Sequence, residues 1–303
     1  MSGHVTDKHL EIAGKFVQQA RGAGGLAPVD LDRFWAAQAV AMADPFGPDI
    51  PQVPLGACCN WECVFEEMGV GQQWKRWRGD AQWRRGLSKA YNDRAEKIVG
   101  RRLLGETPPD PNAPPGYPAI KSLPDIFEMT TRWDDVSQSD WWMEVTGSED
   151  ELARLLDRVD KRLDSLREFL LPDGWDEARE GLMAAGHKPP LYRGQRGPVT
   201  FAAAVTGPEN LIFLIYDTPD LAVRFRDTIL RAMLEKARIQ DEEAGHAPED
   251  APHGFSFCDD NCCLLTGHMY ELFGLPIVKG LWDRYSPDPA DTRYQHSDSD
   301  MGH

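Results

Sequence analysis

Apolar residues recur every three or four positions over several stretches of the chain, and this spacing predicts helices. The clearest stretch is residues 148–171, where one apolar stripe is formed by Leu152, Leu155, Leu156, Val159, Leu163, Leu166 and Leu170. Ser148 and Glu151 have the spacing of a capping box at its start, and Pro172 with Gly174 ends it. This pattern is typical of a helix that belongs to the core.

Further helices are predicted on both sides of that stretch. Two lie within residues 6–43, with Thr6 and Asp30 as N-caps and glycines between them, and helical segments continue to about Leu104. Another helix begins after Thr218, has Pro219 in its first turn and runs to about Ala244. Thr266 can cap a last helix, which we expect Pro276 to end.

Short apolar runs between these helices predict strands. They lie at residues 53–58, 197–207, 254–257 and 294–296. Strands that alternate with helices of 10 to 20 residues indicate a parallel sheet with crossover helices. The chain is therefore expected to have an α/β fold.

Polar residues follow the strand that begins after Gly254. Asp259 and Asp260 come at its end, and Asn261, Cys262 and Cys263 follow them. A strand that ends in polar residues before a helix is how an α/β barrel builds the rim of its active site. The alternative is that the two carboxylates only cap and solvate a loop.

Composition limits the organisation and the partners. With 303 residues the chain can bury a large core, and its length fits one domain of barrel type as well as two smaller ones. We expect one domain over residues 1–303. Residues 1–50 would be an N-terminal helical extension, and residues 105–118, with six prolines, a loop that covers a site or links two parts.

A net charge of −16 disfavours nucleic acid and anionic membranes as partners. No segment approaches the ~20 apolar residues of a membrane helix. Charges stand where a signal peptide would have its apolar core, so we expect a cytoplasmic protein.

Two local features have structural explanations. Six cysteines form two clusters without the paired spacing of a closed zinc site, so we expect reduced thiols: Cys58, Cys59, Cys63, Cys258, Cys262 and Cys263. Five cations interleave with tryptophans at residues 74–85, which favours a helix whose cations cover apolar rings: Lys75, Arg76, Arg78, Arg84 and Arg85. The aromatic and acidic residues of 128–142 could line a pocket or pack on the surface.

Three blocks of the sequence together resemble the uroporphyrinogen decarboxylase superfamily. They are GPVTFAAAVTGPENLIFLIYDTPD, GFSFCDDNCCLLTGHMYELFGLPIVKGL and YQHSDSDM, within residues 197–303. The superfamily joins uroporphyrinogen decarboxylases to zinc-dependent methyltransferases that act on corrinoid proteins or on thiols. The resemblance implies a TIM-type (β/α)8 barrel with its site at the carboxyl ends of the strands. Two further β/α units would follow the last strand, so we expect a truncated sequence or a partner that completes the barrel.

The departures from the family pattern bear on the activity. The decarboxylases carry the motif R-Q-A-G-R-Y after the first strand, whereas this chain has Asn60, Trp61 and Glu62 there and no arginine. Glu62 would repel substrate carboxylates, which disfavours haem-pathway decarboxylation. The methyltransferases use His-x-Cys for zinc, where this chain has His296 and Asp298. The soft thiolate that would activate a thiol substrate is missing there.

The resemblance assigns the expected site residues. Asp259, Asp260 and His296 are the expected catalytic residues, and a metal, most simply zinc, would be held by His296, Asp298, Cys258 and Cys262. His303, at the very end, is not expected to take part. Substrate would contact Asn60, Trp61, Glu62 and Tyr294.

We expect metal-assisted methyl (one-carbon) transfer that involves a small substrate and a corrinoid or thiol acceptor. One alternative is metal-free decarboxylation of a small or tetrapyrrole carboxylate, in which Asp259 stabilises a protonated intermediate. The other is a non-catalytic binding subunit for a small ligand or a corrinoid protein. A homo-oligomer is compatible with the sequence, which does not determine the oligomeric state.

Overall fold

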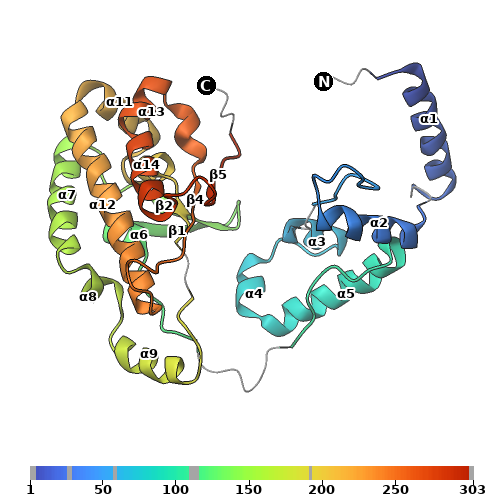
Figure 1. Cartoon of the computed structure of the whole chain (residues 1–303), viewed down its shortest axis with the longest axis horizontal. Coiled ribbons are helices and arrows are strands. Elements are labelled where there is room, and N and C mark those ends of the chain that lie inside the picture. The colour runs from blue at the N-terminus through green and yellow to red at the C-terminus, as the bar shows by residue number, and fades with distance from the viewer. Residues whose placement is uncertain (1–4, 26–28, 57–59, 109–115, 191–192, 300–303) are drawn as a thin grey trace. The chain divides into compact units, whose positions relative to one another are not determined.

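The computed structural model describes residues 5–25, 29–56, 60–108, 116–190 and 193–299. The chain divides into two compact units, Met1–Asp110 and Pro111–His303 (Figure 1). The division falls inside the proline-rich segment 105–118. The expected single domain over residues 1–303 stays a prediction, and each unit is described by itself.

The regular elements of the first unit are all helices within its described residues. Its elements are α1 (Asp7–Gly22), α2 (Leu31–Ala43), α3 (Trp61–Glu67), α4 (Trp74–Gly79) and α5 (Ala81–Val99). The two helices predicted within residues 6–43 are confirmed with their caps. The Thr6 side chain accepts from the His9 backbone N–H, and Asp30 accepts from that of Arg33.

The core of the first unit is built from aromatic rings. Val64, Phe65 and Leu87 are buried, and four tryptophans pack around them: Trp61, Trp74, Trp77 and Trp83. The Arg76 guanidinium lies 4.8 Å from the Trp83 ring centre, and that of Arg84 lies 5.1 Å from Trp77. The predicted covering of these rings by cations is confirmed.

The strand predicted at residues 53–58 is wrong for its described part. Residues 53–56 have no strand structure, and the remainder, with Cys58 and Cys59, lies outside the described residues. Prolines at positions 51 and 54 restrict this segment and remove backbone donors that a ladder needs. Asn60 is the N-cap position of α3, so Trp61 and Glu62 lie in the first turn of a helix.

The second unit combines helices with two small sheets. Its helices are α6 (Leu123–Ile126), α7 (Glu149–Leu163), α8 (Leu166–Leu170), α9 (Trp175–Ala184), α10 (Pro198–Thr206), α11 (Pro208–Asp217), α12 (Pro219–Glu243), the 3₁₀ helix η1 (Asp260–Leu264), α13 (Gly267–Leu272) and α14 (Gly274–Tyr285). The long helix α12 packs against both α7 and α14 and runs through the core (Figure 1).

The three-stranded sheet is parallel, as the alternation of strands and helices predicts. Its order is β3 (Gln195–Arg196), β4 (Phe255–Cys258) and β5 (Arg293–His296), and Cys258 lies opposite both Arg196 and His296. The second sheet is an antiparallel hairpin of β1 (Thr130–Asp134) and β2 (Ser139–Met143). No closed barrel forms among the described strands, so the eight-stranded fold stays a prediction.

Helix boundaries differ from expectation in three places. The predicted strand at residues 197–207 is wrong, because Pro198 begins the helix α10, which Gly207 ends. The predicted stop at Pro276 is also wrong, since this proline lies in the first turn of α14, where a missing N–H costs little. The predicted helix at 148–171 is two helices, α7 and α8.

The capping box predicted at the start of α7 is shifted by one residue. The Ser148 hydroxyl accepts from the Glu151 backbone N–H, as expected. The Glu151 carboxylate, however, accepts from the backbone N–H of Gly147 and not from that of Ser148.

Two buried charged side chains, Glu243 and Lys236, lie near the end of α12. The Glu243 carboxylate accepts from the indole N–H of Trp175 at 2.8 Å and pairs with Arg167 and Arg179. Lys236, about two turns earlier, is 7% exposed, and its amine donates to Gln240 at 3.0 Å. Burial lowers the pKa of Lys236 to about 8, because a charged amine loses its hydration there.

The substitution Lys236→Met should therefore stabilise the protein at pH 7, by roughly 1–3 kcal/mol. Between about pH 8 and pH 10.5 the unfolded amine binds more protons than the folded one, so the Lys236 penalty fades as pH rises. Urea unfolding of both proteins from pH 7 to pH 10.5 measures this. A difference in the free energy of unfolding that is independent of pH would contradict it.

Candidate functional site

A cleft of about 680 Å³ opens beside the carboxyl ends of β3 and β4. The hairpin supplies Trp141 and Trp142 on β2 to its wall, and α10 supplies Thr200 and Phe201. Its charged and amide groups are Glu144, Asp140, Arg196, Asp260 and Asn261. The cleft therefore joins aromatic surface to a mixed set of charges, a combination typical of small-molecule sites.

Asp259 holds the start of α10 next to the end of β4. Its side chain is fully buried, and its carboxylate accepts from the Thr200 backbone N–H at 2.7 Å and from that of Val199 at 3.4 Å. These are N–H groups of the first turn of α10, which have no partner inside the helix. A residue at the end of β4 thus caps a helix that begins directly after β3.

The Asp259 carboxyl titrates above its ordinary range. Burial raises its pKa, and the hydrogen bonds from Thr200 and Val199 oppose this effect only in part. Asp259 does not line the cleft. The geometry gives it the role of positioning α10. Of the two aspartates expected to be catalytic, Asp260 fits that role better, because Asp260 reaches the cleft.

Three predicted site residues meet at the ends of β4 and β5. Asp260, His296 and Asp298 offer ligand atoms that all lie within 4.8 Å of one another. His296 Nε2 lies 3.1 Å from an Asp298 carboxylate oxygen, and the Asp298 backbone N–H donates to Asp260 at 2.8 Å. Asp260 belongs both to this group and to the wall of the cleft.

The donor set suits a divalent cation with a preference for oxygen and nitrogen. One imidazole and two carboxylates can bind Zn²⁺, Mn²⁺ or Fe²⁺. The two expected sulfur ligands do not join the group. The Cys262 thiol donates to the Asp259 carbonyl at 2.6 Å, and burial raises its pKa, which keeps the sulfur protonated.

A second group of the same type lies at the opposite end of the sheet. His253, Asp288 and Asp291 also bring their ligand atoms within 4.8 Å of one another. They flank the amino ends of β4 and β5, and His253 lies 2.9 Å from an Asp291 oxygen. None of these three residues lines the cleft. The second group can therefore serve as a control for metal binding by the group of Asp260, His296 and Asp298.

The remaining predicted residues lie elsewhere. Tyr294, on β5, is about half exposed and does not line the cleft. Asn60, Trp61 and Glu62 belong to the first unit, so their contact with a substrate in the second unit stays a prediction. His303 lies outside the described residues.

Sequence reasoning missed Arg196 and Glu144. Arg196 is the last residue of β3, and its guanidinium lies 3.9 Å from the Asp260 carboxylate. Arg196 directly precedes the sequence block 197–220 that carries part of the family resemblance. This position could have identified it, because strand ends deliver side chains to sites of this kind. Glu144 follows β2, and no sequence motif marks it.

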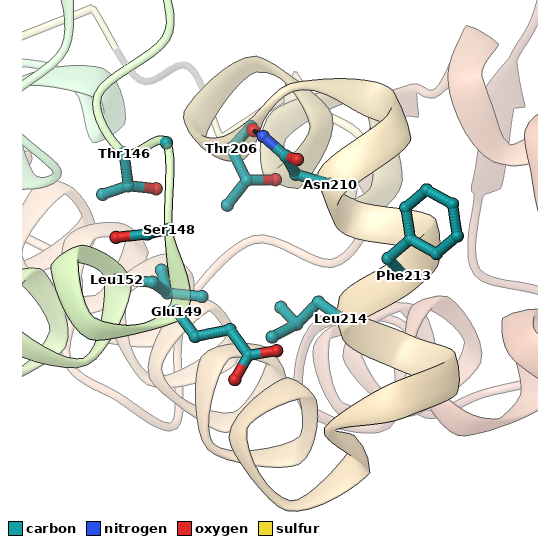
Figure 2. A pocket seen from close by; sticks show the side chains of 9 residues that line it. Thr146, Ser148, Glu149, Leu152, Thr206, Asn210, Phe213 and Leu214 are labelled. Carbon is teal, nitrogen blue, oxygen red and sulfur yellow. Dashed lines mark hydrogen bonds between the residues drawn. The ribbon is translucent and has the colours of Figure 1, made fainter.

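A smaller pocket of about 120 Å³ lies near the start of α7 (Figure 2). Thr146, Ser148 and Glu149 form one side, and Thr206, Asn210 and Phe213 face them from α10 and α11. The Thr146 hydroxyl is buried and has no hydrogen-bond partner among the described residues.

Comparisons of the chain with protein-family models, with curated proteins and with solved structures found no match. The resemblance to the uroporphyrinogen decarboxylase superfamily therefore stays a prediction that rests on the three sequence blocks.

Within the described residues, no single helix has the length and apolar character needed to cross a bilayer. The bent pair α10 and α11, with 101° between its halves, meets that test by length and composition when taken together.

The contact between Gly197 and Asp259 gives a test of the site's framework. A Cβ atom on Gly197 would lie 2.0 Å from the Asp259 Cβ, so Gly197→Ala must displace the cap of α10. We expect the free energy of unfolding to fall by about 1–3 kcal/mol. Thermal and urea unfolding measure this loss.

Gly181→Ala in α9 is the matched control. Nothing lies within 4 Å of a Cβ there, and alanine in a helix should raise stability by about 0.5–1 kcal/mol. Equal effects of the two substitutions would show that the close approach at Gly197 is unimportant.

Proposed function

We propose that this chain is an enzyme that binds a small substrate in the cleft beside β3 and β4. The observation that supports this is the shared position of Asp260, which lines the cleft and belongs to the His/Asp/Asp group. A divalent cation held by Asp260, His296 and Asp298 would polarise a substrate oxygen or other heteroatom. Methyl (one-carbon) transfer is the reaction that the sequence resemblance implies.

The chain's own residues would bind and orient the substrate. The rings of Trp141 and Trp142 offer an apolar wall, and Arg196 offers a cation for an anionic group of the substrate. Asp260 reaches the cleft from the end of β4, so a cation that it holds would lie at the cleft wall, beside a bound substrate. The oxygen and nitrogen donors, without a thiolate, favour a corrinoid acceptor over a thiol that must be activated.

Arg196 also supports a second candidate, metal-free decarboxylation. The absence of an arginine after the first strand argued against carboxylate substrates, but Arg196 places a guanidinium in the cleft itself. Asp259, which we expected to stabilise a protonated intermediate, is buried and engaged by α10. Asp260 would have to take that role.

Metal binding by the full chain tests the proposal. We expect one Mn²⁺ or Zn²⁺ per chain at the first group and a loss of at least ten-fold in affinity in His296→Ala, because removal of one of three protein ligands weakens the site by an order of magnitude or more. Calorimetric titration of protein stripped with a chelator measures it.

His253→Ala is the control, since it disrupts the matching group at the other end of the sheet. Equal metal affinity of wild type and His296→Ala would contradict the metal site.

Release of CO₂ from a small carboxylate substrate by the chelated enzyme would favour the decarboxylase instead. Methyl transfer to free cobalamin that requires added metal would favour the first proposal. A cytoplasmic location and a small-molecule substrate are part of this proposal.

A further inference from the structure

The charges of the chain are divided unevenly between its units. Residues 1–110 carry 14 basic and 14 acidic side chains, so the whole net charge of −16 belongs to residues 111–303. Within the first unit, residues 74–102 carry ten basic and three acidic side chains. A net charge of +7 is therefore concentrated on α4, α5 and the turn after them.

A pocket of about 330 Å³ opens on this basic segment. Trp61 and Trp77 form an aromatic wall, with ring centres 5.4 Å apart. Arg84, Arg85 and the buried Ser88 reach the pocket from α5. The opposite wall consists of Leu103, Leu104, Gly105 and Thr107.

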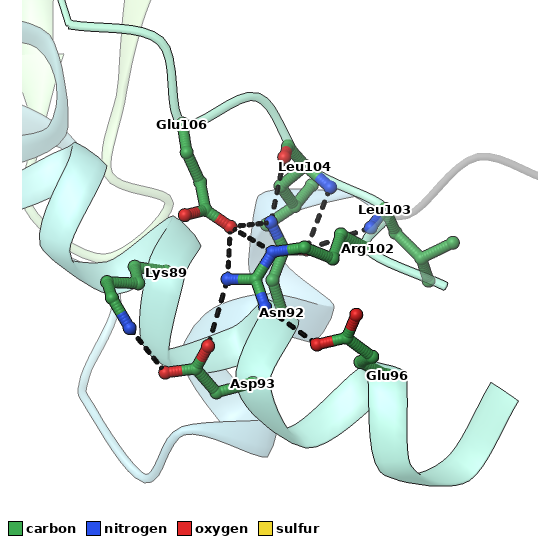
Figure 3. Close-up of polar contacts among 8 residues, drawn as sticks. All are labelled: Lys89, Asn92, Asp93, Glu96, Arg102, Leu103, Leu104 and Glu106. Carbon is green, nitrogen blue, oxygen red and sulfur yellow. Dashed lines mark hydrogen bonds and ion pairs between the residues drawn. The ribbon is translucent and has the colours of Figure 1, made fainter. Parts of the chain in front are cut away.

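The opposite wall is held in place by a polar network (Figure 3). The Asn92 side chain accepts from the backbone N–H groups of Leu103 and Leu104, at 2.8 and 2.9 Å, and donates to the Leu104 carbonyl. Arg102 pairs with Asp93, Glu96 and Glu106. The pocket is thus bounded by a fixed segment and does not depend on a free loop.

This network engages Asp93, Glu96 and Glu106 and, within the described residues, leaves Arg84 and Arg85 without a carboxylate partner. Hydrogen bonds from Asn92 and Arg102 hold the pKa of Glu106 below its usual value, so it stays ionised and engaged. Neither Arg84 nor Arg85 has an acidic side chain within 4 Å among the described residues. Arg84 donates to the Trp77 carbonyl and lies over its ring, whereas Arg85 is exposed and lines the pocket.

The Trp77 indole adds a donor to the same wall. Its N–H is buried and has no acceptor among the described residues. An indole N–H and two guanidinium groups can only donate, the hydroxyls of Ser88 and Thr107 can also donate, and no carboxylate lines the pocket among the described residues. The lining therefore selects an acceptor-rich, negatively charged ligand with a flat apolar part.

We infer that the first unit contains a binding site for a small aromatic anion, in which the ring contacts Trp61 and Trp77 and the carboxylate or phosphate group binds Arg85. The site is distinct from the cleft of the second unit and does not depend on its function. Its size suits a ligand with one or two rings.

Calorimetric titration of the full chain tests this inference. The probes are naphthalene-1-acetate and 1-naphthyl phosphate, with naphthalene-1-acetamide as the uncharged counterpart of the first. We expect both anions to bind and the amide to bind at least ten-fold more weakly, because a hydrogen bond between charged groups is worth about 1.5–3 kcal/mol. The tighter of the two anions identifies the preferred acidic group.

Variants locate the site. Arg85→Gln should weaken anion binding by about ten-fold, and Arg85→Lys should restore part of it. Lys97→Gln, which removes a charge from α5 outside the pocket, should leave the affinity unchanged. Circular dichroism confirms that the variants are folded.

Several results would overturn the inference. Equal affinities for naphthalene-1-acetate and naphthalene-1-acetamide would show that the ligand's charge does not matter. Equal losses of affinity in Arg85→Gln and Lys97→Gln would show that the general positive potential of the segment, and not a defined site, attracts the anion. Binding of a short oligothymidylate, without binding of either naphthyl anion, would assign the basic segment to nucleic acid. No binding of any probe would also contradict it.

Discussion

The candidate site depends on the hydrogen bonds that the buried Asp259 carboxylate accepts from the first turn of α10. The carboxylate links the end of β4 to the first turn of α10, which itself begins after β3. Two segments about 60 residues apart in sequence are thereby held together at the edge of the parallel sheet. Gly197 permits this contact, because any larger residue would occupy the space of the Asp259 side chain. The cleft, with Thr200 and Phe201 on one wall and Asp260 on another, follows from this arrangement.

Sequence patterns predicted the elements whose signals are local. The caps at Thr6, Asp30 and Thr266, the strand β4 and the parallel sheet are confirmed. The strand predicted at residues 197–207 is a helix, and short apolar runs have no period that distinguishes strand from helix. Pro198 and Gly207, which begin and end α10, carried the better signal.

Part of the candidate site could be predicted because its residues follow local strand signals. Asp260, His296 and Asp298 follow strand ends, and parallel strands bring their carboxyl ends together. The exclusion of Cys262 was not predictable, because it depends on the hydrogen bond of its thiol to a carbonyl three residues earlier. The positioning role of Asp259 depends on a tertiary contact with α10, which no pattern within residues 254–276 contains.

We propose that Asp260 joins a metal-binding group to the substrate cleft. The most direct measurement is anomalous diffraction from crystals of the full chain soaked in Mn²⁺. We expect a peak within about 2.0–2.4 Å of ligand atoms of Asp260, His296 and Asp298, at the distances that Mn²⁺ shares with other hard cations. Manganese bound only by His253, Asp288 and Asp291, or by neither group, would contradict it.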